Sequence, residues 1–227
     1  MTFYECGLHS LPEGFDSPSR LALAAKRLGY DGIIICNHSG QENLFLPEAC
    51  RNINEIEIAF GIEVMASNPR SLSSRVSSAR GRYPFLAVHG GTDEINRAAC
   101  ESADVDVLLH PTESRRGLST VAAKSAQRNQ VAIGFDLGPM IRLRGTARSR
   151  WLETLGRDLS LARKFNLGMM ITTGPWSHLD MRGPREIMAM AEMAGFEPDE
   201  IRDGLALPAR ILELNRKNWK GPGVELL

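Results

Sequence analysis

Short apolar runs recur along the chain at intervals that leave room for a helix between them. The runs are rich in β-branched residues, and each is continuous rather than alternating with polar positions. Continuous apolarity is typical of strands covered on both faces, as in a parallel sheet. The pattern therefore predicts about seven parallel strands. The runs are TFYECGL (2–8), DGIIICN (31–37), EIEIAFGIEV (55–64), PFLAVHG (84–90), DVLLH (106–110), VAIGFDL (131–137) and GMMITTG (168–174).

Helix signals occupy most of the intervals between these runs. Ser17 and Pro18 precede RLALAAKRLG, so a cap, a first-turn proline and a terminal glycine stand where a helix prefers them. Thr92 and Asp93 precede EINRAACESA, which places acids at the positive end of the helix dipole. Further helices are expected from residue 117, from Ser149 and from Pro184 onward.

Strands and helices thus alternate, which favours an α/β fold. Seven such units fit a TIM-barrel-like parallel β/α barrel better than a flat doubly wound sheet, because no GxGxxG or P-loop marks a switch point. A flat sheet remains the alternative. No linker or repeat interrupts the chain, so we expect a single domain over 1–227, with 215–227 as a C-terminal extension.

Composition excludes several protein classes. Hydrophobic residues at 43% and charged residues at 24% are ordinary for a compact globular protein. No stretch approaches the length of an apolar membrane span, and MTFYECGLHSL has no signal-peptide pattern, so a cytoplasmic protein is expected. The cysteines, at 6, 36, 50 and 100, form no CxxC pair, which favours buried reduced thiols over a zinc knuckle.

The formal net charge of zero conceals an asymmetry. Residues 1–113 carry nine basic and fifteen acidic side chains, whereas residues 114–227 carry eighteen basic and twelve acidic ones. The stretch RLRGTARSR (142–150) holds four arginines and no acid. Arginine binds phosphate bidentately, so an acidic partner is indicated for the second half. A GC-rich genome, which favours arginine codons throughout, is the alternative explanation.

Side chains that can carry chemistry stand at the predicted carboxyl ends of the strands, where the active sites of β/α barrels lie. They are His9, Asn37, His38, Glu63, His89, His110 and Asp136. Histidines packed with satisfied hydrogen bonds at the barrel mouth are the alternative interpretation. No GxSxG motif or paired-carboxylate motif accompanies them.

This set resembles the metal site of the PHP family of metal-dependent phosphoesterases, which are irregular barrels. The family's DLHxH and DH motifs read GLHSL (7–11) and NH (37–38) here, and only its G-x-E motif, at 61–63, is intact. The missing groups are the anionic and bridging ones that a multi-metal site needs to make hydroxide from water. A vestigial site is therefore expected, with no metal and no cofactor bound.

The second half of the chain carries more specific motifs. They are VAIGFDLGPMIR (131–142) and TTGPWSHLDMRGPRE (172–186), supported by EINRAA (94–99), the Gly-Leu pair at 117–118 and the closing NRK and GPGVE. Together they resemble archaeal ribonuclease P protein component 3, the counterpart of the thirty-kilodalton subunit of the eukaryal enzyme. The resemblance covers nearly the whole chain. The chain departs from the family's usual residues at 119–120 and at 173–176. The helix start at 117 and the loop at 173–178 are therefore the places where the family's contacts transfer least well to this chain.

The resemblance implies a non-catalytic subunit of an endoribonuclease holoenzyme whose RNA removes the 5′ leader from precursor tRNA. The partners it implies are the ribonuclease P RNA, precursor tRNA indirectly, ribonuclease P protein component 2 and the other protein subunits. No membrane partner is expected. The protein surface used for component 2 is not placed by the sequence.

The candidate RNA contacts are arginines that, except for Arg97, lie in predicted loops or at helix starts, where they can neutralise phosphates without reading bases. A solvated charged face, or ion pairs with acidic helices, is the alternative for each. The first set is Arg142, Arg144, Arg148 and Arg150, the second is Arg182 and Arg185, and the third is Arg97, Arg115 and Arg116.

A function of a different class stays open alongside this one. The chain could be a stand-alone metal-dependent phosphoesterase that uses the strand-end residues. Stoichiometric zinc or manganese, with hydrolysis of a phosphate ester abolished by Glu63→Ala, would favour that function. The residues it would use are His9, His38, Glu63, His89 and His110.

Overall fold

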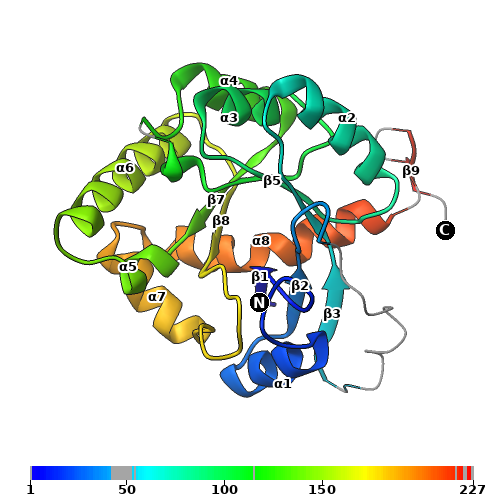
Figure 1. Ribbon diagram of the computed structural model, residues 1–227, viewed down its shortest axis with the longest axis vertical. Coiled ribbons are helices and arrows are strands. Elements are labelled where there is room, and N and C mark those ends of the chain that lie inside the picture. The colour runs from blue at the N-terminus through cyan, green and yellow to red at the C-terminus, as the bar shows by residue number, and fades with distance from the viewer. Residues whose placement is uncertain are drawn as a thin grey trace.

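Parallel strands alternate with helices in the computed structural model, which describes residues 2–41, 53, 55–114, 116–217, 219–221 and 224–225 (Figure 1). The strands are β1 (Tyr4–Leu8), β2 (Gly32–Ile35), β3 (Glu57–Phe60), β4 (Ile62–Val64), β5 (Leu86–His89), β6 (Val107–Leu109), β7 (Ala132–Asp136) and β8 (Met169–Thr172). The helices are α1 (Pro18–Leu28), α2 (Pro69–Arg80), α3 (Asp93–Cys100), the 3-10 turn η2 (Pro111–Glu113), α4 (Thr120–Asn129), α5 (Gly138–Arg142), α6 (Gly145–Lys164), α7 (Pro184–Met193) and α8 (Pro198–Arg216). Two short antiparallel strands, β9 (Trp219–Gly221) and β10 (Val224–Glu225), follow α8 within the predicted C-terminal extension.

The stretch 55–64, predicted as one strand, forms two strands that belong to different sheets. β3 pairs with β2 in the sheet β1-β2-β3, and β4 pairs with β5 in the sheet β4-β5-β6-β7-β8. The chain changes partner at Gly61, where a Cβ atom would lie 2.8 Å from the carbonyl oxygen of Phe85 and 3.0 Å from Cys36 Sγ. Only a residue without a side chain permits this close approach of backbones.

The two sheets together form the predicted barrel rather than a flat sheet. A parallel bridge between His38 and Glu63 links the end of β2 to β4. On the other side, the hydroxyl of Thr172 in β8 lies 2.5 Å from the carbonyl oxygen of Cys6 in β1. The first and last strands therefore lie side by side, which a doubly wound sheet does not allow.

Apolar side chains pack on both faces of the strands, as the continuous apolar runs predicted. Inside the barrel lies a buried cluster that includes Cys6, Phe85, Val107 and Met170. Leu212 of α8 joins this cluster, and Figure 1 shows α8 running across the strands while the other helices surround them. A larger cluster fills the layer between strands and helices. The barrel is a packed core closed by α8, and its chemistry is confined to the mouth.

Three predicted helix starts are confirmed and a fourth is shifted, whereas α2, capped by Asn68, and α8 were not predicted. The Ser17 side chain accepts a hydrogen bond from the Arg20 amide at the start of α1, and the Thr92 side chain accepts one from the Ile95 amide at the start of α3. α7 begins at Pro184 as expected. α4 begins three residues later than predicted, because Ser119 and not Gly117 supplies the cap.

The arginine-rich stretch is not the loop that the sequence predicted. α5 ends at Arg142, and α6 begins at Gly145 rather than at Ser149. Only Leu143 and Arg144 connect the two helices. Arg144 occupies the N-cap position and makes no side-chain capping bond, so α6 starts without the local signal by which a helix start is recognised.

From its composition, the chain was expected to have buried, unpaired cysteines and no membrane-spanning segment. Cys6, Cys36 and Cys100 are free and buried, as predicted, while Cys50 lies outside the described residues. In the part of the chain that the structure describes, no helix combines the length and the apolar content needed to span a bilayer.

Candidate functional site

The strand-end residues predicted from the sequence meet in one pocket at the barrel mouth. His9 directly follows β1, His38 lies beyond β2, and Glu63 is part of β4. His89 ends β5, and His110 directly follows β6. The carboxyl ends of parallel strands meet at one edge, so these five side chains converge although they are far apart in sequence.

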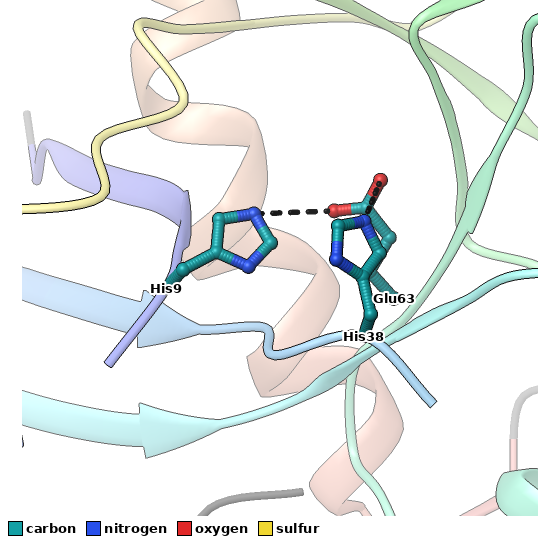
Figure 2. A group of neighbouring side chains, drawn as sticks. All are labelled: His9, His38 and Glu63. Carbon is teal, nitrogen blue, oxygen red and sulfur yellow. Dashed lines mark ion pairs between the residues drawn. The ribbon is translucent and has the colours of Figure 1, made fainter. Parts of the chain in front are cut away.

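Glu63 is the centre of this pocket, and its side chain is fully buried. Its Oε1 atom lies 2.6 Å from His89 Nδ1 and 3.6 Å from both His38 Nε2 and His110 Nε2. Its Oε2 atom faces His9 Nε2 at 3.8 Å, and no hydrogen-bond partner for Oε2 occurs among the described residues. Figure 2 shows His9 and His38 with their rings directed at the Glu63 carboxylate.

A second carboxylate, Glu13, holds the outer nitrogens of two of these histidines. Its Oε2 lies 3.1 Å from His9 Nδ1, and its Oε1 lies 2.5 Å from His38 Nδ1. The backbone amide of His38 also donates to Glu13 Oε2 at 2.8 Å. Glu13 therefore fixes the orientation of both rings toward Glu63.

Glu113 faces the other two histidines in a similar but looser way. Its Oε1 lies 3.5 Å from His110 Nδ1, and its Oε2 lies 3.7 Å from His89 Nε2. Neither Glu13 nor Glu113 was predicted from the sequence. The available signal was spacing, because each acid lies three or four residues after a strand-end histidine, as in HSLPE and HPTE.

The loop after β8 covers one side of the pocket with an indole ring. Trp176 stacks on His9 with ring centroids 4.5 Å apart, and His9 stacks in turn on His38 at 4.7 Å. The backbone amide of His9 donates to the carbonyl oxygen of Pro175. Trp176 remains 37% exposed, so it lies at the rim, between the pocket and solvent.

Charges in the pocket are strongly coupled. Burial acts to raise the pKa of Glu63, but hydrogen bonds from His38 and His89 outweigh it and hold the pKa well below its usual range. Burial likewise opposes the charged form of His89, yet the Glu113 and Glu63 carboxylates raise the pKa of His89 to about 10. The pocket thus stabilises a central carboxylate ringed by imidazoles.

Three residues stand where the PHP motifs have metal ligands, and their structure shows why the ligand set of a multi-metal site is incomplete here. Gly7 has a φ of +72°, a backbone conformation that disfavours the aspartate of the motif. Leu11 replaces a histidine and is exposed. Asn37 turns to the backbone, because its Oδ1 accepts from the Ser10 amide at 2.9 Å and its Nδ2 donates to the Ser10 carbonyl oxygen at 2.8 Å. None of the three supplies an anionic ligand.

Two groups of three side chains nevertheless have ligand atoms close enough to hold an ion. One is His9, His38 and Glu63, and the other is Glu63, His89 and His110. Within each group the ligand atoms lie within 4.8 Å of one another. Imidazole and carboxylate donors suit divalent transition metals. The chemistry that the pocket offers is therefore ion binding rather than nucleophilic attack by a side chain.

The first arginine set lies at the same end of the barrel but is only partly free. Arg142 is 3.1 Å from Asp136 Oδ2, and Arg148 Nε donates to the carbonyl oxygen of Leu143 at 2.8 Å. Arg144 also donates to that carbonyl oxygen, at 3.1 Å. Arg150 is exposed, and no bond to its side chain is found among the described residues. Two of the four therefore brace the α5–α6 connection.

The second and third sets divide in the same way. Arg182 donates to the carbonyl oxygens of three preceding residues, which ties it to its own loop. Arg97 pairs with Glu101 at 2.7 Å on the surface of α3. Arg185 and Arg116 are exposed, and Arg115 lies outside the described residues. Their contact with RNA stays a prediction.

Comparison with known proteins agrees with the resemblance indicated by the motifs in the second half of the chain. A sequence model of the family described as RNase P subunit p30 matches residues 3–220. Ribonuclease P protein component 3 from Methanosarcina barkeri is 38% identical over 226 residues, covering 97% of this chain and 92% of that protein. The protein of the same description from Methanococcoides burtonii is 39% identical over 229 residues, covering 99% and 94%.

Solved structures are similar in fold. A chain of the cryo-EM structure of archaeal ribonuclease P with mature tRNA has a TM-score of 0.82 at 21% identity, covering 99% of this chain and 97% of that chain. Histidinol phosphate phosphatase from Lactococcus lactis, solved with zinc, L-histidinol and phosphate, has a TM-score of 0.57 at 14% identity, covering 86% and 95%. At these identities the similarity supports the α/β barrel and nothing finer.

Proposed function

This chain belongs to the RNase P subunit p30 family, and from that membership we propose that it assists the ribonuclease P RNA in removing the 5′ leader from precursor tRNA. Its curated relatives are ribonuclease P protein components, and a chain of an archaeal ribonuclease P complex shares its fold. The partners we propose are the RNA subunit, precursor tRNA indirectly, protein component 2 and the other protein subunits. We also propose the cytoplasm as the place where it works, which cell fractionation can test.

One observation carries the RNA-binding part of this proposal. Four exposed arginines, which we call the arginine rim, follow the carboxyl ends of neighbouring strands in one sheet. Among the described residues, none of the four has an acidic partner within ion-pair distance. Arg116 follows β6, Arg144 and Arg150 follow β7, and Arg185 follows β8.

Such an arrangement suits backbone recognition of RNA. Each arginine that contacts a phosphate releases condensed counterions, and this supplies affinity without base readout. A-form RNA favours contacts of this type because its major groove is too narrow for side chains. Arg142 pairs with Asp136, and the half-buried Arg148 and Arg182 donate to backbone carbonyls, so these three would support the rim rather than neutralise phosphates. Arg144 also donates to backbone carbonyls, but its side chain is exposed, so we keep it in the rim.

Reconstitution tests the proposal. Precursor tRNA is incubated at moderate magnesium with the cognate RNA subunit and the other protein subunits, with and without this chain. We expect the chain to raise the cleavage rate and to cleave nothing when added alone. An unchanged rate, with RNA binding no better than that of a neutral protein, would contradict the proposal.

The same experiment separates this function from a stand-alone phosphoesterase. That alternative predicts hydrolysis of a phosphate ester by the chain alone, abolished by Glu63→Ala. Our proposal expects no such hydrolysis, since the pocket lacks the acids that complete a multi-metal site.

A further inference from the structure

We propose that His9, His38 and Glu63 bind one divalent ion of the zinc class, which ties together the mouth ends of β1, β2 and β4. This departs from the expectation, drawn from the sequence, that the site holds no metal. It is independent of the RNA-binding proposal, because none of these residues belongs to the arginine rim.

The separations of the donor atoms fit one ion. His9 Nε2 lies 3.8 Å from Glu63 Oε2, and His38 Nε2 lies 3.6 Å from Glu63 Oε1. Bonds of about 2.0–2.1 Å in a tetrahedral site place neighbouring ligand atoms roughly 3.3 Å apart. The two observed separations exceed this spacing by about 0.5 and 0.3 Å, and all three ligand atoms lie within 4.8 Å of one another, so small side-chain shifts would bring them to ligand distance of one ion. Two imidazoles and one carboxylate favour zinc over magnesium, which prefers oxygen ligands.

Glu13 prepares the two histidines for this role. Because its carboxylate faces Nδ1 of both His9 and His38, at 3.1 and 2.5 Å, the rings are held with Nδ1 protonated. Nε2 of each ring then presents its lone pair on the side of Glu63, and His38 Nε2 also lies 3.2 Å from His89 Nδ1. Carboxylates that orient ligand histidines in this way are typical of zinc sites.

An unpaired buried atom points to the same ion. Glu63 is fully buried, and no hydrogen bond reaches its Oε2 from the described residues. An unsatisfied buried carboxylate oxygen is costly, and His9 Nε2 at 3.8 Å is too distant to donate to it. An ion between these two atoms would satisfy both.

The second group of ligand atoms does not hold a further ion. Glu63 Oε1 is already bound by His89 Nδ1 at 2.6 Å, which is closer than two ligands of one ion can lie. Glu113 faces the other ring nitrogens of these histidines, His110 Nδ1 and His89 Nε2, rather than Glu63. Asp136 accepts from the Gly138 amide at 2.7 Å through Oδ1 and pairs with Arg142 through Oδ2. One ion, with its fourth position open to water, is therefore the arrangement that the pocket supports.

Zinc titration of the chelator-treated full-length chain tests this inference. Elemental analysis and calorimetry should show one zinc per folded chain. The thermal midpoint should rise by roughly 5 °C at a hundredfold excess of zinc over its Kd, and not with magnesium at the same concentration. A folded chain that takes up no stoichiometric zinc, or that takes up two ions, would overturn the proposal.

Four variants locate the ion. Glu63→Gln should lose stoichiometric zinc, whereas His110→Asn, which tolerates the left-handed backbone at that position, should keep it. Glu13→Gln should weaken binding by about 10- to 100-fold. Loss of zinc in His110→Asn together with retention in His9→Ala would place the ion elsewhere and reject the assignment.

Cobalt provides a measurement that does not depend on the folding of any variant. Cobalt(II) substituted into the wild-type chain should give the intense visible absorption of a tetrahedral site, and an equivalent of zinc should abolish it. A weak octahedral spectrum would contradict the proposed ligand set, whatever the variants show.

Discussion

Glu5 lies fully buried beneath the loop that follows β8, where two hydroxyl groups face its carboxylate. The Thr172 hydroxyl is 2.6 Å from Glu5 Oε1 and 2.5 Å from the carbonyl oxygen of Cys6. The Tyr30 hydroxyl is 2.7 Å from Glu5 Oε2 and 2.8 Å from the carbonyl oxygen of Arg182. Each hydroxyl has one proton for two acceptors, so a proton on Glu5 relieves the conflict. Burial accordingly raises the pKa of Glu5 to about 7.

This raised pKa makes stability depend on pH. The folded state binds a proton on Glu5 more tightly than the unfolded state, so its contribution is complete below about pH 4.5 and is lost as the pH rises through about 7. In Glu5→Gln the amide can donate to Tyr30 and carries no titratable proton. The free energy of unfolding of the wild type relative to this variant should fall by about 2.5 kcal/mol between pH 5 and pH 8.

Urea unfolding of both proteins at several pH values measures this difference. Asp158, whose pKa burial also raises to about 7, titrates in both proteins and cancels from the comparison. A difference that is constant across the range would show that Glu5 is already ionised in the folded chain.

At the barrel mouth, some site residues could be predicted from the sequence and others could not. The histidines could be predicted because each one stands where a strand ends, and strand ends converge. Glu13 and Glu113 were missed, because Glu13 lies outside the helices and strands and Glu113 ends the short 3-10 turn η2, so that only their spacing from a strand-end histidine could have indicated them. Glu5 could not either, since an acid inside an apolar run gives no indication of which hydroxyls it will meet.

Among the elements, the segment before α4 is joined to α6 by a buried hydrogen bond. Asp158 in α6 accepts a hydrogen bond from the Leu118 amide at 2.6 Å, and its other oxygen has no partner among the described residues. Gly117 has a φ of +68°, and a Cβ atom there would lie 2.2 Å from Asp158 Oδ1. The glycine is therefore needed twice, for its backbone conformation and for the space beside Asp158.

Gly117→Ala should lower the free energy of unfolding by at least about 2 kcal/mol, from a strained backbone and a clash with a buried carboxylate. Gly145→Ala is the matched control. Gly145 also has a positive φ, +53°, but no atom lies within 4 Å of the position of its Cβ. The control should lose only about 1 kcal/mol. Equal losses in the two variants, by thermal or chemical unfolding, would show that the contact with Asp158 contributes nothing.

Local signals allowed several elements to be predicted, although α2, which Asn68 caps, was missed, and elements set by distant contacts could not be predicted. Ser17 and Thr92 begin helices through their own side chains, so α1 and α3 begin where expected. The break between β3 and β4 results from the approach of Gly61 to Phe85, which no local pattern reveals. α6 begins without a capping side chain, so the sequence pattern predicts a loop over the arginine-rich stretch where the structure has a helix.

At the scale of the whole molecule, charge and topology act together. Neutrality of the chain conceals a basic second half, and exposed arginines of that half lie in the segments that follow β6, β7 and β8 along the chain. The arginines of α8 differ, because each pairs with an acid: Arg202 with Asp199, Arg210 with Asp203 and Arg216 with Glu57. Removing equal amounts of charge from the arginine rim and from α8 therefore tests whether RNA binds the arginines that have no acidic partner.

The rim variant changes Arg144, Arg150 and Arg185 to alanine, and the control variant changes the three arginines of α8. Exposed ion pairs contribute about 0–1 kcal/mol, so both variants should remain folded. Removing one arginine that neutralises a phosphate should reduce the slope of log K for RNA binding against log salt by ~0.7–0.9. The rim variant should therefore lower the slope by roughly two units, while the control leaves it near the wild-type value. Equal changes in both would mean that RNA senses net charge alone, and a change confined to the control would place the RNA on α8 instead of the mouth.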